Sequence, residues 1–127
     1  MHTIKRNRRL RANEAIRQLT KETIITPNDF LVPLFVVEGK GVKEEIPSMP
    51  NYFRLSLDQL KKEVNELYNL GLRAVLLFVK VPDALKDNEG KEAVNPNGLM
   101  QRAIKTVKNA CPQMLVMTDV ALDPYSI

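Results

Sequence analysis

Three short apolar runs divide this chain, and polar segments with helical periodicity lie between them. The runs are FLVPLFVVEG at 30–39, AVLLFVKV at 74–81 and MLVMTDVAL at 114–122. Continuous apolar runs of this length are typical of strands that are buried on both faces of a parallel sheet. Because proline has no N–H for a sheet ladder, Pro33 predicts an edge strand or an early position in the first strand.

The segment SLDQLKKEVNELYNLG at 56–71 is the clearest helix. Its leucines and Val64 recur every three or four residues and form one apolar face. Ser56 and Gln59 have the spacing of a capping box, which predicts the start of the helix. Gly71 predicts its end, because glycine tolerates the left-handed conformation that closes many helices.

A second helix is predicted for NGLMQRAIKTVKNAC at 97–111, with Asn97 as the N-cap. Cys111 falls on the apolar stripe of this helix and is expected to be a small buried side chain. Two loops complete this part of the chain. Residues 39–53 contain two glycines and two prolines and predict a long loop, and residues 83–97 predict a charged loop.

Ahead of the first strand, the sequence predicts a short amphipathic helix at 12–20 and a capped turn at 26–29. In the turn, Thr26 is the expected cap, Pro27 occupies the first helical position and Asp29 lies in the first turn. These elements form an extended and helical arm before the body of the chain.

The resulting β-α-β-α-β order predicts right-handed crossovers and a parallel sheet. Two α/β architectures fit this order, an open doubly wound sheet and the first part of a (β/α)8 barrel. In both architectures, ligands bind beyond the carboxyl ends of the strands. No GxGxxG segment follows any of the strands, which argues against dinucleotide binding.

The composition, with 44% hydrophobic and 27% charged residues among 127, is that of one small globular domain. No apolar run approaches the roughly 18 residues that a membrane span needs, and the first residues lack the apolar segment of a secretory signal. A single cysteine excludes an internal disulfide and a multi-thiolate metal site. We therefore expect a cytoplasmic protein that does not contact membranes.

The net charge of +4 comes from the amino-terminal end. Five of the 19 lysines and arginines lie in the first eleven residues, and the rest of the chain has 14 basic against 15 acidic side chains. A basic arm can bind nucleic acid or anionic lipid. This arm lacks the interleaved aromatic residues of single-strand binding proteins. Docking on a partner subunit, or simple solvation, is therefore the favoured interpretation.

Asp119 and Asp123 are the main candidates for chemistry. Asp119 interrupts the third apolar run, where a carboxylate is costly unless it has a partner or meets water at a site. On an extended segment, residues four apart face the same side, so both carboxylates are expected to point together until Pro124 turns the chain. The structural alternatives are an ordinary bridge for Asp119 and an Asx-Pro turn at Asp123.

Three further residues are weaker candidates. Lys80 ends the second strand and could form a Schiff base, although an exposed ammonium is more common at such a position. Glu38 ends the first strand and is expected to be a solvated loop carboxylate. His2, the only histidine, lies in the terminal arm, which argues against a histidine base or metal ligand.

Several motifs together resemble a known family. They are RRLRANEAIRQL at 8–19, PLFVVEG at 33–39, IPSMP at 46–50, NPNGLMQRAI at 95–104 and TDVALDPYS at 118–126. In this order and at these separations, they are similar to the amino-terminal part of delta-aminolevulinic acid dehydratases, the porphobilinogen synthases. The resemblance covers nearly the whole chain from Arg8 onward.

The resemblance implies a (β/α)8 barrel, of which this chain would hold about three strands and two main helices. It implies a lyase that condenses two molecules of 5-aminolevulinate to porphobilinogen for haem and other tetrapyrroles. Residues 1–29 would be an arm for subunit contacts in a homo-octamer, and 30–127 the first β-α-β-α-β part of the barrel. The family's Schiff-base lysines belong to later strands, so we expect this chain to be an inactive fragment, and Lys80 does not match them.

The resemblance also implies site residues. Asp119 would be the active-site carboxylate, and Asp119 and Phe78 would contact the substrate. Zinc-dependent members carry cysteine ligands where this chain has Ala121 and Asp123, which argues against zinc. A carboxylate suits magnesium, so Asp123 is the candidate Mg²⁺ ligand.

Two alternatives to this enzyme are open from the sequence. One is a small α/β interaction module whose basic arm binds nucleic acid or an acidic partner. For the enzyme that the chain resembles, we expect no binding of nucleic acid. The other is a different barrel enzyme with magnesium held by carboxylates.

Overall fold

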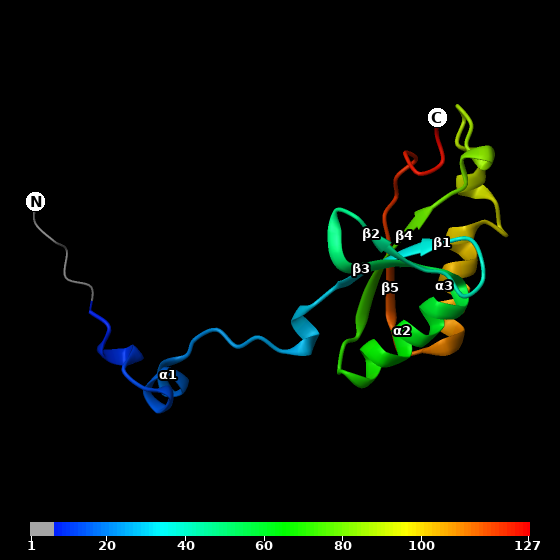
Figure 1. Cartoon of the computed structure of the whole chain (residues 1–127). Helices are drawn as coiled ribbons and strands as arrows, with labels where there is room; N and C mark the ends of the chain where they lie inside the picture. Colours follow the sequence, from blue (N-terminus) through cyan, green and yellow to red (C-terminus); the bar gives the residue numbers. More distant parts are fainter. Residues whose placement is uncertain (1–6) are drawn as a thin grey trace, which may run out of the picture.

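A computed structural model describes residues 7–127, and these form one mixed sheet, two helices that pack on it, and an arm (Figure 1). The helices and strands, in chain order, are α1 Glu14–Thr20, β1 Val32–Val37, β2 Lys43–Ile46, β3 Met49–Leu55, α2 Leu57–Asn69, β4 Ala74–Lys80, α3 Leu99–Ala110 and β5 Leu115–Thr118. Short 3-10 turns lie at Arg9–Arg11, Pro27–Asp29, Asp83–Leu85 and Lys91–Val94.

The sheet has the order β2-β3-β1-β4-β5. Strands β1, β4 and β5 are parallel neighbours, β3 is also parallel to β1, and β2 and β3 form an antiparallel hairpin. Helices α2 and α3 pack against each other and both contact β1, so they cover the same face of the sheet. The predicted β-α-β-α-β order is therefore present, with the hairpin inserted after its first strand.

The hydrophobic core lies between the sheet and these two helices. Alternate residues of each central strand point into it, as the twofold periodicity of a strand requires. Leu34 and Val36 of β1 lie level with Leu77 and Val79 of β4 in the parallel register, and all four are buried. Leu60, Val64 and Leu67 of α2 and the apolar stripe of α3 complete this layer, which confirms the predicted apolar faces. Leu70, which the prediction placed on the face of α2, is instead 71% exposed.

The opposite face of the sheet is also apolar, but no helix of the described chain covers it. Phe35 stacks on Phe78 with ring centroids 5.4 Å apart, and Phe35 meets Tyr52 edge to face at 5.9 Å. On β5, Leu115 and Met117 remain 53% and 43% exposed. Within residues 7–127, β5 is an edge strand, so the sheet ends with an unpaired backbone and an uncovered apolar surface.

Pro33 is the second residue of β1, which confirms the predicted early position, but the alternative of an edge strand is wrong. Strand β1 is the middle strand of five. Strand β3 pairs with β1 only at Phe35 and Val36, so no ladder bond is lost beside Pro33. The Tyr52 hydroxyl donates to the Pro33 carbonyl and satisfies that acceptor.

The predicted loop at 39–53 contains the hairpin of β2 and β3, and this part of the prediction is wrong. Pro47 and Pro50 lie in or beside the tight connection, where they do not prevent pairing. Arg54 of β3 donates to Glu44 of β2 at 3.1 Å and joins the two strands. The register shifts between Glu45 and Ile46, so the hairpin lacks the simple alternation by which a strand is detected.

Helix α2 begins after Ser56 and ends before Gly71, as predicted, but the bonds of the predicted capping box are absent. Ser56 precedes the helix but makes no capping bond. Its fully buried hydroxyl accepts from the Val42 N–H at 2.9 Å and donates to Asp58 at 2.6 Å. Gly71 has the predicted left-handed backbone, with φ of 95°. Its N–H donates to the carbonyl of Tyr68 and so closes the last turn.

Two other caps can be compared with their predictions. Helix α3 begins after Gly98, so the expected N-cap at Asn97 is wrong by one residue. At the predicted turn, the Asp29 carboxylate accepts from the N–H and the hydroxyl of Thr26 at 2.6 and 3.0 Å, and Pro27 opens the 3-10 turn as expected.

Most of the arm lies away from the body of the molecule, and its turn at Pro27–Asp29 comes close to Gly71 after α2 (Figure 1). From residue 7 to residue 31, every side chain is exposed except that of Ile16, which is half-buried. Asn13 caps α1 by accepting from the Ile16 N–H at 2.9 Å, yet Leu19 on the apolar stripe is 87% exposed. The division at 29/30 remains a prediction. No helix of residues 7–127 has the length and apolar character of a membrane span.

Candidate functional site

The carboxyl ends of the parallel strands meet at one end of the sheet, where the carboxyl-terminal segment and the loop after β4 also lie (Figure 1). Strand β5 ends at Thr118, which pairs with Leu77 of β4. The next residues along the two strands are Asp119 and Phe78. The parallel register therefore brings the predicted carboxylate beside the predicted aromatic residue.

A pocket of about 120 Å³ lies at this position. Asp119, Asp123 and Phe78 all line it, so the three residues that the sequence singled out surround one space. The other lining residues are apolar or small: Leu77, Val79, Met100, Ala121, Pro124 and Tyr125. The pocket thus combines an apolar wall with two exposed carboxylates, an arrangement suited to a small polar ligand that carries a positive charge.

The reason that Asp119 and Asp123 share this pocket differs from the one predicted. The strand ends at Thr118, so the two residues do not lie on one extended segment. Instead, the chain turns back at its end, where the N–H groups of Tyr125 and Ser126 donate to the Leu122 carbonyl at 2.9 and 3.0 Å. This turn brings Asp123 back toward the pocket.

Tyr125 fixes the turn to the rest of the molecule. Its side chain is buried, and its carbonyl accepts from the Asp87 N–H at 3.2 Å. Gly90 lies directly against Leu122 and Tyr125, where an added Cβ would come within 3.6 and 3.9 Å of their side chains. Burial raises the pKa of the Tyr125 hydroxyl above 10.0, and the charge of Glu92 raises it further. The loop after β4 therefore holds the segment that carries the carboxylates.

A groove of about 360 Å³ continues from the pocket along α3. Asp119, Ala121 and Tyr125 line both hollows, and Gln101 lines only the groove. The Gln101 amide donates to the Ala93 carbonyl at 2.9 Å, whereas its buried Oε1 has no hydrogen-bond partner among the described residues. Apart from Thr118, the remaining lining of the groove is apolar, and Val120 and Leu122 are largely exposed.

The described residues offer few ligands for a metal ion. Residues 7–127 contain no group of three or more His, Cys, Asp or Glu side chains that could hold one. At the pocket, the chain itself supplies at most the carboxylates of Asp119 and Asp123. This pair does not fit a structural zinc site, which needs four nitrogen or sulfur ligands. It fits magnesium better, because Mg²⁺ often binds through one or two carboxylates and keeps several waters.

A second polar hollow, of about 340 Å³, lies at the ends of β1 and β4. Lys80 and Glu38 both line it, and Lys80 is exposed at the end of its strand. Glu38 is partly exposed, and its carboxylate accepts a charged hydrogen bond from Arg102 of α3, so it is paired rather than only solvated as expected. Arg102 is a residue that sequence reasoning missed.

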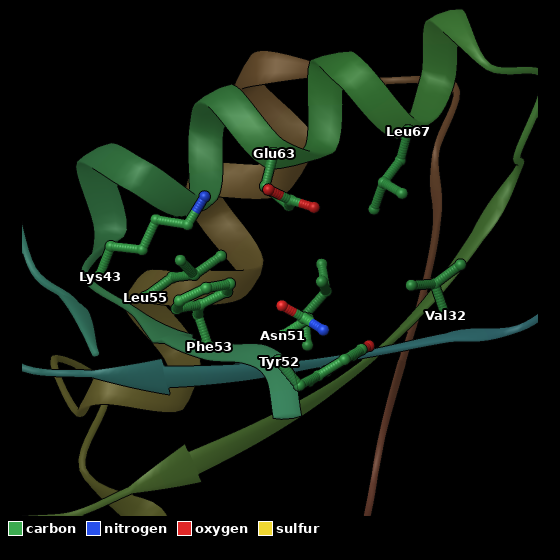
Figure 2. A pocket seen from close by; sticks show the side chains of 9 residues that line it. Val32, Lys43, Asn51, Tyr52, Phe53, Leu55, Glu63 and Leu67 are labelled. Carbon is green, nitrogen blue, oxygen red and sulfur yellow. The ribbon is translucent and has the colours of Figure 1, made fainter. Parts of the chain in front are cut away.

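Another pocket, of about 160 Å³, lies between α2 and the hairpin (Figure 2). Its walls are mainly apolar, and Glu63 points from α2 into the space above Asn51 and Tyr52. The Lys43 ammonium lies 4.7 Å from the Phe53 ring centre. Neither carboxylate from the end of β5 reaches this pocket, so it is separate from the candidate site.

Two remaining predictions concern Cys111 and His2. Cys111 is buried and free, as the apolar stripe predicted. His2 lies outside the described residues.

Comparisons with known proteins agree with the motifs. The family model described as delta-aminolevulinic acid dehydratase matches residues 4–127. A delta-aminolevulinic acid dehydratase from Chlamydia pneumoniae is 48% identical over 122 residues, which are 96% of this chain and 37% of that protein. One from Bacillus subtilis is 44% identical over 121 residues, again 37% of its length. The chain thus spans little more than a third of these relatives.

A solved structure shows the same fold. The delta-aminolevulinic acid dehydratase (porphobilinogen synthase) of Toxoplasma gondii, in complex with the reaction product porphobilinogen, aligns with a TM-score of 0.89 and 47% identity. The match covers 96% of this chain and 34% of that one. The predicted fold class, the first part of a (β/α)8 barrel, is confirmed, with β1, β4 and β5 as its parallel strands.

Proposed function

Because the chain belongs to the delta-aminolevulinic acid dehydratase family, we propose that it forms the opening part of a porphobilinogen synthase. The reaction condenses two molecules of 5-aminolevulinate to porphobilinogen with the loss of two waters, which places it among the lyases. The observation that carries this proposal is the single pocket formed by Asp119, Asp123 and Phe78 at the carboxyl end of the parallel strands. In barrel enzymes, this end of the strands carries the active site.

We propose distinct roles for these three residues. The Asp119 carboxylate accepts hydrogen bonds from the substrate amino group and can take up or return its proton. Phe78 supplies an apolar wall that orients the carbon chain of the substrate. The lysines that would form Schiff bases lie outside this sequence in our proposal. Lys80 is not assigned that role, because it lines the other hollow.

Magnesium is the metal that we propose for Asp123. Within residues 7–127, Asp119 is the only other carboxylate that lines this pocket, so most ligands of the ion would be waters. When bound, Mg²⁺ would supply positive charge near the pocket. Ala121 and Asp123 offer no thiolate, which is why zinc is not proposed.

We further propose that the arm docks on a second copy of the chain in a homo-oligomer. Leu19, Ile24 and Ile25 are 87%, 68% and 68% exposed, and such a series of apolar side chains is seldom left in water. This observation favours a protein partner over nucleic acid, because the exposed series is aliphatic and offers no stacking surface. We also propose a cytoplasmic location, which suits the buried free thiol of Cys111.

The experiment uses a joined polypeptide, in which residues 1–127 are followed by the part of the Chlamydia pneumoniae relative that this chain does not match. We expect it to form porphobilinogen from 5-aminolevulinate, measured by the colour reaction of the pyrrole with dimethylaminobenzaldehyde. The 127-residue chain alone should form none. A joined polypeptide that folds, assembles and yields no product would contradict the proposed function.

A further inference from the structure

Arg102 connects two parts of the molecule that are far apart in the sequence. It lies in α3, and one guanidinium nitrogen donates to the carboxylate of Glu38 at the end of β1. Its Nε donates to the Asn97 carbonyl at 2.9 Å, in the loop that precedes α3. One planar side chain therefore joins the carboxyl end of β1 to the loop after β4.

That loop is joined internally by hydrogen bonds where Arg102 holds it. The Asn97 N–H donates to the Asn95 side-chain oxygen at 2.9 Å, and the Asn95 amide donates to Glu92 at 3.0 Å. The Gly98 N–H donates to the Asn95 carbonyl at 2.9 Å. Asn97 is therefore linked by hydrogen bonds to residues 92–98 of the loop.

The same loop and helix support the candidate site. Met100, two residues before Arg102, lines the pocket of Asp119 and Asp123. The loop also carries the Asp87 N–H that donates to Tyr125. The helix and the loop that Arg102 joins are therefore the same elements that contact the carboxylate segment.

We propose that Arg102 is a positioning residue, which through Glu38 and Asn97 sets the place of Asp119 and Asp123 relative to the strand ends. The catalytic part of this proposal rests on the proposed function, whereas the positioning part does not. Both partners of the ion pair are more than a third exposed, so the pair contributes little to global stability. Its effect should instead appear in local order and turnover.

The shape of arginine is essential to this role. The guanidinium presents several N–H groups in one plane and can bond to two acceptors at once. A lysine at this position keeps the charge but offers a single ammonium, which reaches Glu38 or the Asn97 carbonyl and not both in the same geometry. Arg102→Lys should therefore restore only part of the function that Arg102→Gln loses.

The first test measures backbone hydrogen exchange in the 127-residue chain. In Arg102→Gln and in Glu38→Gln, we expect residues 87–98 and 119–126 to exchange about tenfold faster, while β1 and β4 exchange as before. Lys91→Gln is the matched control. It removes a positive charge and the exposed ion pair with Glu89 from the same loop, but that pair joins only near neighbours in the sequence.

The second test measures turnover of the joined polypeptide. We expect kcat/KM to fall about tenfold in Arg102→Gln and in Glu38→Gln, with an unchanged thermal midpoint and no effect of Lys91→Gln. The double variant should be no worse than either single variant, because the two residues act as one unit.

The outcomes separate the two proposals. Unchanged exchange at 119–126 in both variants overturns the positioning role, whatever the activity. Altered exchange with no product from the unsubstituted joined polypeptide overturns the proposed function and leaves the positioning role supported. A lowered thermal midpoint with faster exchange throughout the chain would show an ordinary structural role and overturn the inference.

Discussion

Leu76 and Leu77 are neighbours in β4 and point to opposite faces of the sheet, so they test which face is packed within this chain. Leu77 is fully buried between the sheet and α3. Leu76 is half-buried and faces the side on which Phe35 and Phe78 stack without a covering helix. Truncating each leucine to alanine should therefore have very different effects in the 127-residue chain.

The magnitudes follow from burial. Leu77→Ala removes a fully enclosed side chain and leaves a cavity, which costs about 3 kcal/mol of unfolding free energy. Leu76→Ala loses only part of its transfer free energy and leaves no closed cavity, so we expect about 1 kcal/mol. In the joined polypeptide, further strands should close over the open face. Leu76→Ala should then cost about 3 kcal/mol as well.

Urea denaturation followed by circular dichroism provides the measurement, with Leu77→Val as a milder variant if Leu77→Ala is already unfolded without urea. Equal losses for the two leucines in the 127-residue chain would refute the assignment of the core to the helix side. An unchanged, small loss for Leu76→Ala in a folded joined polypeptide would show that the open face is not the inside of a closed barrel.

Three further predictions concern the site and the backbone. In the joined polypeptide, Asp119→Asn should lower kcat by about 100-fold, because it removes the proposed proton acceptor; Asp123→Asn should mainly raise the Mg²⁺ concentration for half-maximal activity, and wild-type kinetics in both would contradict the assigned roles. Gly71→Ala should lower the free energy of unfolding by about 1–2 kcal/mol because of its left-handed φ of 95°, and by more because the new Cβ would lie 3.3 Å from the Pro27 side chain. Gly41→Ala is the control, because Gly41 has a φ of 71° but lies in open space. Equal urea midpoints for the two variants would exclude the Pro27 contact. Burial raises the pKa of Tyr52 and Tyr125 above 10.0, and the charges of Glu63 and Glu92 raise it further. The two neutral hydroxyls therefore stabilise the folded state below the unfolded-state pKa, and this stabilisation is lost as the pH rises through the folded-state pKa. When both tyrosines are replaced by phenylalanine, the free energy of unfolding should fall less steeply above pH 10.

Apolar periodicity predicted the parts of this fold that depend on local pattern. The runs at 30–39 and 74–81 became β1 and β4 because both faces of a parallel strand need apolar residues. The end of α2 at Gly71 followed from the same kind of local chemistry. The hairpin at 43–55 was missed because β2 is mainly polar, β3 contains Pro50 and lacks regular alternation, and the pairing of each depends on a partner strand.

The candidate site was predictable in part. Asp119 and Phe78 come together because parallel strands end at the same edge, and this rule needs only the order of elements. The position of Asp123 depends on a turn at 122–126. The sequence indicated a turn at Pro124, but it did not show the bonds to the Leu122 carbonyl that bring Asp123 back to the pocket. Arg102 pairs with Glu38 across 64 positions, a distance over which no local pattern connects two residues.

The central claim is that Asp119 and its neighbours line the mouth of a barrel that the described residues only begin. Complementation tests it directly. The 127-residue chain is titrated with a separate polypeptide that corresponds to the unmatched part of the Chlamydia pneumoniae relative, and porphobilinogen formation is measured. We predict that product formation, absent with either piece alone, rises to a plateau near an equimolar ratio and is lost with Asp119→Asn. A stable equimolar complex that forms no porphobilinogen would contradict the account.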